Sequence, residues 1–385
     1  MQSFSADKER FLPALLFFAA VLVPVSFFSV QIAAGRLNAA YPAAWALFTA
    51  LTGFFIIYTG KVSFYRRIFF GASAALFLVH FKLSLFSAFA SVGPGEAPYC
   101  HIIMASSFFN YFYQQYLAFM SGDFRLWGPL SAAFLWLFFT LVLGRAWCSW
   151  ACFAGGIDDL LSALPAHALI KTRLPAGMFR DFPAALLIFM LLVSLAQMLP
   201  VYCLWLCPFK LTPVFLDQDA FIRKIQLGLM FFALAVLLLG PLLTKKRTFC
   251  SFLCPFGAWQ AFWGRLNPFR VTVVDTEECA GCFTCLDSCP MYAIKAGPDG
   301  KPERAAYCNL CGECLAACPN GRLSYSVFGL RSPDIKSGFG RLLTPESFLV
   351  FSALVTGGTF AALFAPAALK DAVDLLRRLG HLIIK

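Results

Sequence analysis

The chain has 385 residues, of which 60% are hydrophobic, 17% aromatic and only 13% charged, and its net charge is +11. A soluble domain of this length does not tolerate such a composition, so the sequence predicts a membrane protein. The basic excess does not indicate nucleic-acid binding, because the Lys and Arg residues stand beside apolar segments, as they do in the loops that orient membrane proteins.

Seven apolar segments are long enough to cross about 30 Å of hydrocarbon. They lie near residues 11–32, 41–60, 68–90, 129–146, 183–201, 225–243 and 345–368. The first is longer than the apolar part of a signal peptide, so we expect it to be retained as a span. The last can instead be re-entrant or interfacial. The expected fold is therefore an all-α bundle of six or seven transmembrane helices.

The Lys and Arg residues of the short loops predict the orientation of this bundle. On the side of the N-terminus stand Lys8, Arg10, Lys61, Arg66, Arg67, Arg145, Lys171, Arg173, Arg180, Lys245, Lys246 and Arg247. The other side has Arg36, Arg125, Lys210, Arg223 and Lys224. This bias predicts a multi-pass protein of the bacterial cytoplasmic membrane with a cytoplasmic N-terminus. Arg377, Arg378 and Lys385 violate the rule, unless the last segment does not span or the tail is an amphipathic helix on the outer face.

Two similar cysteine turns follow the fourth and sixth apolar segments. Cys148 and Cys152 stand in GRAWCSWACFAGG, and Cys250 and Cys254 stand in KRTFCSFLCPFGAWQ, which indicates an internal duplication. Residues i and i+4 share one face of a helical turn, so each pair can present two thiolates together. Four such ligands satisfy a [4Fe–4S] cluster, which we expect at the cytoplasmic membrane face. The alternative is that these are ordinary buried or disulfide-bonded cysteines. Asp158 and Asp159, just after the first turn, are expected to cap a helix or face water.

A third C-x3-C pair, Cys203 and Cys207, follows the fifth apolar segment and is expected on the opposite, outer side. Cys100 and His101 lie in the loop after the third segment, on that same side. The four residues make a candidate ligand set for an outer iron–sulfur cluster, because histidine replaces cysteine in some such sites. An outer compartment equally permits a Cys203–Cys207 disulfide, so both alternatives stay open.

Residues 270–325 contain two copies of the motif C-x2-C-x2-C-x3-C-P, which is the run of a bacterial two-cluster ferredoxin. The fourth cysteine of each motif ligates the other cluster in such domains. The expected ligand sets are Cys279, Cys282, Cys285 with Cys318, and Cys308, Cys311, Cys314 with Cys289. Two complete copies weigh against a zinc site built on C-x2-C spacing. We expect a small α+β domain with two [4Fe–4S] clusters in the reducing cytoplasm, and hence electron transfer.

The combination of membrane turns such as CSFLCPFGAWQ with two ferredoxin motifs resembles the membrane polyferredoxin family, which includes NapH-type, NosR-type and CcoG-type electron-transfer proteins. The resemblance covers about residues 129–325, with Phe153 at the position where proline usually stands. It implies electron transfer between a membrane or cytoplasmic donor and an extracytoplasmic redox system. It also implies cluster ligation by Cys148, Cys152, Cys250, Cys254 and the eight ferredoxin cysteines.

These observations divide the chain into four regions. They are a three-span region with an outer loop (1–128), a three-span core with the cysteine turns (129–269), the ferredoxin domain (270–325) and a C-terminal region with the last apolar segment and a basic tail (326–385). We expect the protein to relay electrons between a cytoplasmic reductant, or quinol, and an extracytoplasmic acceptor, as a component of an oxidoreductase system. The alternative is an assembly or regulatory protein whose clusters sense redox state or reduce a metal ion.

Overall fold

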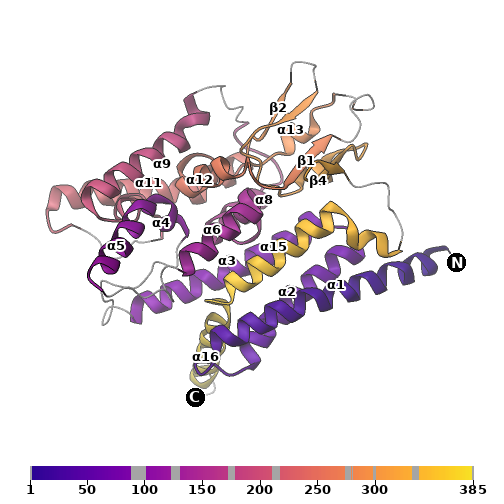
Figure 1. The fold of residues 1–385 in the computed structure, drawn as a ribbon, viewed down its shortest axis with the longest axis horizontal. Coiled ribbons are helices and arrows are strands. Elements are labelled where there is room, and N and C mark those ends of the chain that lie inside the picture. Colours follow the sequence, from indigo (N-terminus) through magenta and orange to yellow (C-terminus); the bar gives the residue numbers. More distant parts are fainter. Residues whose placement is uncertain are drawn as a thin grey trace.

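The computed structural model describes residues 2–87, 101–122, 131–171, 178–209, 217–273, 279, 281–297, 301–331 and 338–383. A bundle of helices carries a small domain with β-strands at one end (Figure 1). The expected fold class, a helical membrane bundle with a small ferredoxin domain, is confirmed.

Long apolar helices form the bundle, and shorter ones connect them. The long helices are α1 (Gln2–Ala33), α2 (Ala40–Thr59), α3 (Val62–Ser87), α6 (Ser131–Leu143), α9 (Met178–Gln197), α11 (Ala220–Thr244), α15 (Pro345–Ala361) and α16 (Ala365–Ile383). The shorter ones are α4 (His101–Ser106), α5 (Phe108–Met120), η3 (Gly144–Ala146), α7 (Trp147–Trp150), α8 (Phe153–Ala163), α10 (Val201–Trp205), η5 (Phe249–Leu253), α12 (Pro255–Trp263) and η6 (Gly338–Leu343). Helices α1, α2, α3 and α15 lie side by side, and α8 packs between α3 and α11 (Figure 1).

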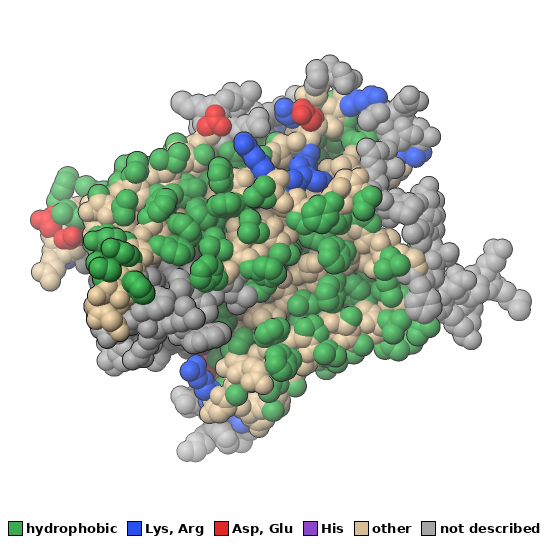
Figure 2. All heavy atoms as spheres, viewed as in Figure 1, with side chains coloured by type: hydrophobic (Ala, Val, Ile, Leu, Met, Phe, Trp, Pro, Cys, Tyr) green, Lys and Arg blue, Asp and Glu red, His purple; other side chains and the backbone are tan. Residues whose placement is uncertain are grey.

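Five stretches are long and apolar enough to cross a membrane: Arg10–Ala33, Ala40–Thr59, Val62–His80, Trp136–Ala163 and Ala220–Thr244. A sixth is obtained if α15 and α16, which are bent by 56° at a short break, are counted as one broken span. Helix α9 adds a shorter apolar stretch, Asp181–Gln197. Figure 2 shows hydrophobic side chains over the faces of the long helices, with Lys and Arg gathered beside the small domain and at the opposite end.

Two contacts explain how the long helices pack so closely. The Trp45 indole on α2 donates a hydrogen bond of 2.9 Å to the Gly358 carbonyl on α15. A Cβ atom at Gly358 would lie 2.8 Å from Thr49 Cγ2, so only glycine permits this approach.

The ends of the helices are also encoded locally. Asp219 caps α11 by accepting hydrogen bonds from the Phe221 and Ile222 amides, as side-chain oxygens do at helix N-termini.

The small domain contains two antiparallel sheets and two short helices. Strand β1 (Phe269–Val273) pairs with β4 (Leu323–Val327), which pairs with β5 (Leu330–Arg331). The register joins Phe269 with Val327 and Val273 with Leu323. Strand β2 (Ile294–Ala296) pairs with β3 (Pro302–Arg304), and α13 (Thr284–Ser288) contacts α14 (Glu313–Ala317). Strands β1 and β4, near the beginning and the end of this domain, therefore lie side by side.

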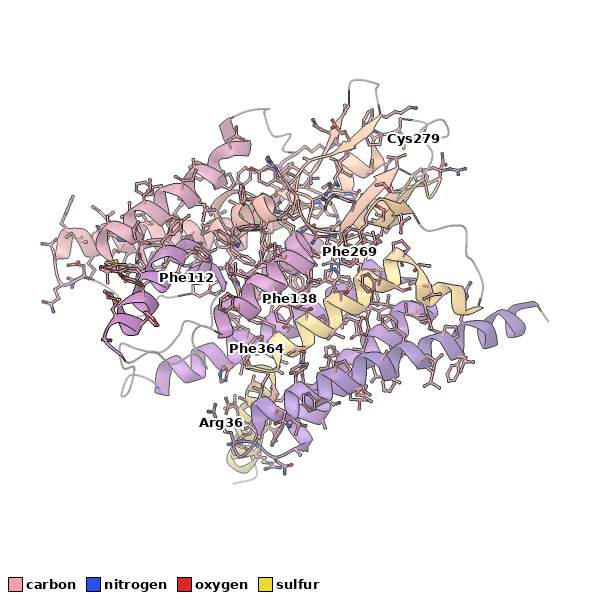
Figure 3. All side chains as sticks on the ribbon, in the orientation of Figure 1. Arg36, Phe112, Phe138, Phe269, Cys279 and Phe364 are labelled. Atoms are coloured by element: carbon pink, nitrogen blue, oxygen red, sulfur yellow. The ribbon has the colours of Figure 1, made fainter. Side chains whose placement is uncertain are left out.

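The region expected to be an outer loop contains helices α4 and α5. They have 6 and 13 residues and are too short to span, because a crossing helix needs about 20 residues. Aromatic contacts attach them to the bundle, such as Phe108 to Trp259 with ring centroids 4.9 Å apart. In Figure 3, Cys279 of the small domain and Arg36, which follows α1, lie at opposite ends of the molecule. Arg36 was expected on the side opposite the ferredoxin domain, and which side of the membrane each end faces stays a prediction.

Candidate iron–sulfur sites

Each of the two expected ferredoxin ligand sets surrounds its own cavity. Cys289, Cys308, Cys311 and Cys314 line a cavity of about 310 Å³. Cys279, Cys282, Cys285 and Cys318 line a second, narrower one. Because α13 contacts α14, the cysteine that ends each motif reaches the set of the other motif. The two sets also adjoin, since the charge of Cys285 in the second set interacts with that of Cys314 in the first.

The thiols of the larger cavity are poorly solvated. Burial raises the pKa of Cys311 to about 11, although the nearby charges of Arg247 and Arg66 act in the opposite direction. Burial likewise raises the pKa of Cys308, as it does that of Cys289, where the neighbouring Cys308 adds to the effect. Four thiolates held this way need a compensating positive charge, which the irons of a cluster supply when bound.

The four membrane cysteines form a third set, at the end of the bundle that faces the small domain. Cys148, Cys152, Cys250 and Cys254 are each 5% exposed or less. The charge of Cys250 interacts with those of the other three. Burial, then Asp158 and the other thiols, raise the pKa of Cys250 well above its usual range. The sequence expectation that the two turns meet agrees with this arrangement, and ligation of a cluster by them remains a prediction.

The duplication seen in the sequence has a local structural basis. Cys152 caps α8, where its sulfur accepts from the Gly155 amide at 3.4 Å, and Cys254 precedes Pro255 at the start of α12. Gly155 and Gly257 each stand three residues after the second cysteine of a turn. A Cβ at Gly257 would lie 3.0 Å from the Cys250 carbonyl oxygen, and one at Gly155 would lie even closer to the Cys148 carbonyl oxygen. Each turn therefore folds back on a helix that leaves no room for a side chain.

Cys148 and Cys152, expected just after the fourth apolar segment, lie within an apolar stretch that continues further than that segment. The apolar stretch runs from Trp136 to Ala163 through both cysteines, and the turn is packed among hydrophobic residues. The turn interrupts the regular helix, so the fourth apolar segment ends at residue 146 in the sequence. The residues of the turn are nevertheless buried like those of the helices on both sides of it. The cysteines are therefore buried within the bundle, at its end beside the small domain.

The third C-x3-C pair is also buried, with Cys203 2% and Cys207 7% exposed. Phe209, two residues after Cys207, packs against Phe153, which directly follows Cys152, with ring centroids 5.3 Å apart. Phe77 of α3 stacks on Phe153 at 3.6 Å. The pair expected on the far side thus approaches the membrane set through an aromatic contact.

The other two members of the expected outer set are not placed fully. Cys100 lies outside the described residues, and of His101 only the backbone is described, at the start of α4. Helix α4 contacts α10, which carries Cys203. The fold therefore brings the two segments of this candidate site together.

Buried ion pairs join the membrane set to the small domain, and sequence reasoning missed them. The expectation that Asp158 and Asp159 face water was wrong, since they are 0% and 1% exposed. Asp158 accepts a hydrogen bond of 2.9 Å from the Cys250 amide. Asp159 pairs with Arg66 at 3.0 Å and with Arg247. The signal in the sequence was Arg247, a basic residue directly before the second cysteine turn.

The Arg66 guanidinium continues this network into the small domain. It donates to the Ser149 carbonyl at 3.0 Å and to Glu313 of α14 at 3.1 Å. Arg67 also donates to Glu313, at 2.7 Å. Glu313 stands between Cys311 and Cys314 in the sequence, so the ion pairs fix the larger ferredoxin cavity against the cysteine turns.

The cysteine sets suit a cluster better than one metal ion. Within the part of the chain that the structure describes, no three His, Cys, Asp or Glu side chains converge on one point as the ligands of a single ion do. Tetrahedral zinc thiolates bring their sulfurs to within about 3.8 Å of one another, given Zn–S bonds of about 2.3 Å. The ligands of a four-iron cube need no such convergence, because each binds a different iron. Each of the three complete sets brings four cysteines together, which is the number of ligands that a [4Fe–4S] cluster takes.

The fold and these cysteine sets define an iron–sulfur protein of the ferredoxin type with membrane helices. A protein family described as a 4Fe-4S binding domain matches residues 125–173, 182–212 and 227–272. Each matched segment contains one of the three C-x3-C pairs. The match therefore concerns the membrane turns and treats the third pair like the other two.

Curated relatives carry ferredoxin-type names. The methylamine utilization ferredoxin-type protein MauN of Methylobacillus flagellatus is 32% identical over 153 residues, which are 40% of this chain and 50% of that protein. The ferredoxin-type protein NapH of Haemophilus influenzae is 26% identical over 205 residues, which are 51% of this chain and 68% of that protein. MauN of Paracoccus denitrificans is 31% identical over 164 residues, 42% of this chain and 53% of that protein.

The chain spans about half the length of the two MauN proteins and two thirds of that NapH protein. No solved structure matches the chain. The comparisons confirm the resemblance to the membrane polyferredoxin family of the NapH type and support electron transport through [4Fe–4S] clusters.

Proposed function

We propose that the protein relays electrons between a cytoplasmic reductant, or quinol, and an acceptor on the far side of the membrane, through four iron–sulfur clusters. The observation that carries this proposal is the series formed by the cysteine sets. The order is Cys279, Cys282, Cys285 and Cys318, then Cys289, Cys308, Cys311 and Cys314, then Cys148, Cys152, Cys250 and Cys254, and last Cys203 and Cys207 with Cys100 and His101.

The step from the small domain into the bundle is supported by short covalent and hydrogen-bonded connections. Pro290, directly after Cys289, accepts a hydrogen bond of 2.9 Å from the Arg247 amide, three residues before Cys250. Ser149, directly after Cys148, donates a hydrogen bond of 2.5 Å to the Asn309 carbonyl, directly after Cys308. Both cysteine turns therefore lie against the same ferredoxin set, which is the arrangement that electron transfer between neighbouring clusters needs.

The step toward the far side is supported by the aromatic contact between Phe209 and Phe153. Electrons tunnel poorly through a full thickness of hydrocarbon, so a transmembrane relay needs centres on the way to both faces. Cys148 and Cys152 belong to the apolar stretch Trp136–Ala163, and the Cys203 and Cys207 pair is buried too, which supports a path that continues from one set to the other. A fourth cluster there would complete the relay.

Iron and acid-labile sulfide, measured on anaerobically purified protein, test the number of clusters. We expect about sixteen irons per chain for the wild type and a loss of about four in Cys203→Ser, because each [4Fe–4S] cluster contains four irons. Cys282→Ser serves as a reference, since it should also lose about four irons but with loss of a ferredoxin signal in EPR. Twelve irons that do not change in Cys203→Ser would exclude the fourth cluster.

Vesicles with trapped ferricyanide test conduction itself. Dithionite added outside should reduce the trapped oxidant through wild-type protein, and Cys203→Ser should abolish this transfer. A protein with all its clusters that does not conduct would contradict the relay and favour the assembly or regulatory alternative.

A further inference from the structure

Arg145 is a buried charge that has no carboxylate partner among the residues that the structure describes. It belongs to η3, which directly precedes the first cysteine turn, and it is 3% exposed. Its guanidinium donates to the Gly257 carbonyl at 2.7 and 3.1 Å and to the Tyr307 carbonyl. No aspartate or glutamate among the described residues forms a salt bridge with it. A buried charge is costly when only neutral groups surround it, so the site calls for a negative partner.

The equivalent residue of the second turn is compensated in a different way. Arg247 also stands three residues before the first cysteine of its turn and is fully buried, but it pairs with Asp159. It also donates to the Cys148 carbonyl at 3.4 Å. Both cysteine turns are therefore preceded by a buried arginine. Among the described residues, a carboxylate pairs with Arg247 and none pairs with Arg145.

Besides Tyr307, the titratable groups whose charges act on Arg145 are cysteines of two different sets. Its charge interacts with Cys148 and Cys250 of the membrane set and with Cys308 of the ferredoxin set. The two carbonyls that hold it belong to the same two regions, since Gly257 follows the second turn and Tyr307 directly precedes Cys308. The Tyr307 ring, 4.8 Å from the guanidinium carbon, adds a weaker cation–π contact.

We infer that Arg145 is a shared counter-charge for the membrane cluster and the adjoining ferredoxin cluster, and that it stabilises the reduced state of both. The inference rests on the proposed function. Reduction brings one electron from the donor and adds one negative charge to a cluster with its thiolates. No bond or proton changes place, and the electron leaves for the next centre. A fixed positive charge between the two sites would stabilise the more negative state of each, so Arg145 is a positioning residue that would raise both potentials.

An EPR-monitored redox titration of Arg145→Gln tests this assignment, with iron content measured on the same samples. At a fixed ambient potential, we expect the ratio of reduced to oxidised cluster to fall about tenfold at both sites, which equals a shift of about 59 mV to more negative potential. The cluster held by Cys279, Cys282, Cys285 and Cys318 is expected to shift less. Arg265→Gln is the matched control, because it removes the same charge from an exposed position of the same region.

Arg145→Lys separates charge from hydrogen bonding. Lysine keeps the charge but cannot form the forked contact to two carbonyls. Potentials near those of the wild type in Arg145→Lys support the inference, also if Arg145→Gln fails to load its clusters. Three results would overturn the inference. The first is a potential lowered as far in Arg145→Lys as in Arg145→Gln, and the second is an unchanged potential in Arg145→Gln with all its clusters. The third is loss of clusters from both variants. Absence of these clusters from the wild type would instead refute the proposed function.

Discussion

Asp159→Asn is expected to lower the free energy of unfolding by about 3–5 kcal/mol, because it removes one partner of a buried ion pair and leaves the others uncompensated. Asp159 holds three guanidinium groups, at 3.0 Å from Arg66, 3.6 Å from Arg67 and in closer contact with Arg247. The side chains of Arg66 and Arg247 are 0% exposed. Glu313, itself 20% exposed, would remain as a partner of Arg66 and Arg67, and Arg247 would lose its salt bridge.

The loss should also be visible in the clusters. Arg247 fixes the second cysteine turn against the first, and Arg66 joins the first turn to α14 of the small domain. Without Asp159 we expect the iron content to fall and the small domain to become more accessible to protease. Denaturation in detergent, iron content and limited proteolysis of the same preparations measure the three effects.

Two further variants serve as controls for Asp159→Asn. Lys295 and Glu303 form an ion pair of 2.9 Å in the small domain, with side chains 49% and 54% exposed. Glu303→Gln should change stability by at most about 1 kcal/mol, as exposed pairs do. Combining Asp159→Asn with Arg247→Met should restore part of the lost stability, because no unpaired guanidinium then remains at that position. Equal stability of Asp159→Asn and the wild type would contradict the role given to this network.

Spacing along the chain predicted the helices and the cysteine sets because both depend on near neighbours. Apolar stretches of 20 or more residues form helices wherever they meet lipid, and cysteines two to four residues apart share a turn. The grouping of Cys289 with Cys308, Cys311 and Cys314 could be predicted, because the fourth cysteine of such a motif joins the set of the other motif.

Contacts between distant segments could not be predicted in this way. Asp159 and Arg247 are separated by 88 positions, and Arg66 and Asp159 by 93. Nothing local marks Asp159 as buried, since an acidic residue after an apolar turn is usually solvated. The depth of Cys152 was missed for a related reason. The neighbouring Phe153 packs on Phe77 of α3 and on Phe209 of the segment after α10, which are distant in the sequence.

Gly155→Ala is expected to abolish the membrane cluster, with a loss of about four irons, while the two ferredoxin clusters remain. The new Cβ would lie well inside 3.0 Å of the Cys148 carbonyl oxygen, which belongs to the backbone of the cysteine turn and cannot rotate away. Overpacking of this kind usually costs about 1–3 kcal/mol and moves the backbone. Because the Gly155 amide also donates to Cys152 Sγ, the shift displaces two of the four expected ligands at once. Iron analysis and EPR of the reduced protein measure the loss.

The chain offers a graded series of controls for this substitution. At Gly257 the new Cβ would lie 3.0 Å from the Cys250 carbonyl oxygen, so Gly257→Ala should weaken the membrane cluster less than Gly155→Ala. At Gly228, in the middle of α11, no atom lies within 4 Å of the new Cβ, and alanine is the better helix former. Gly228→Ala should therefore keep all its irons. A membrane cluster that survives in Gly155→Ala as it does in Gly228→Ala would mean that close packing of the two turns does not position the ligands.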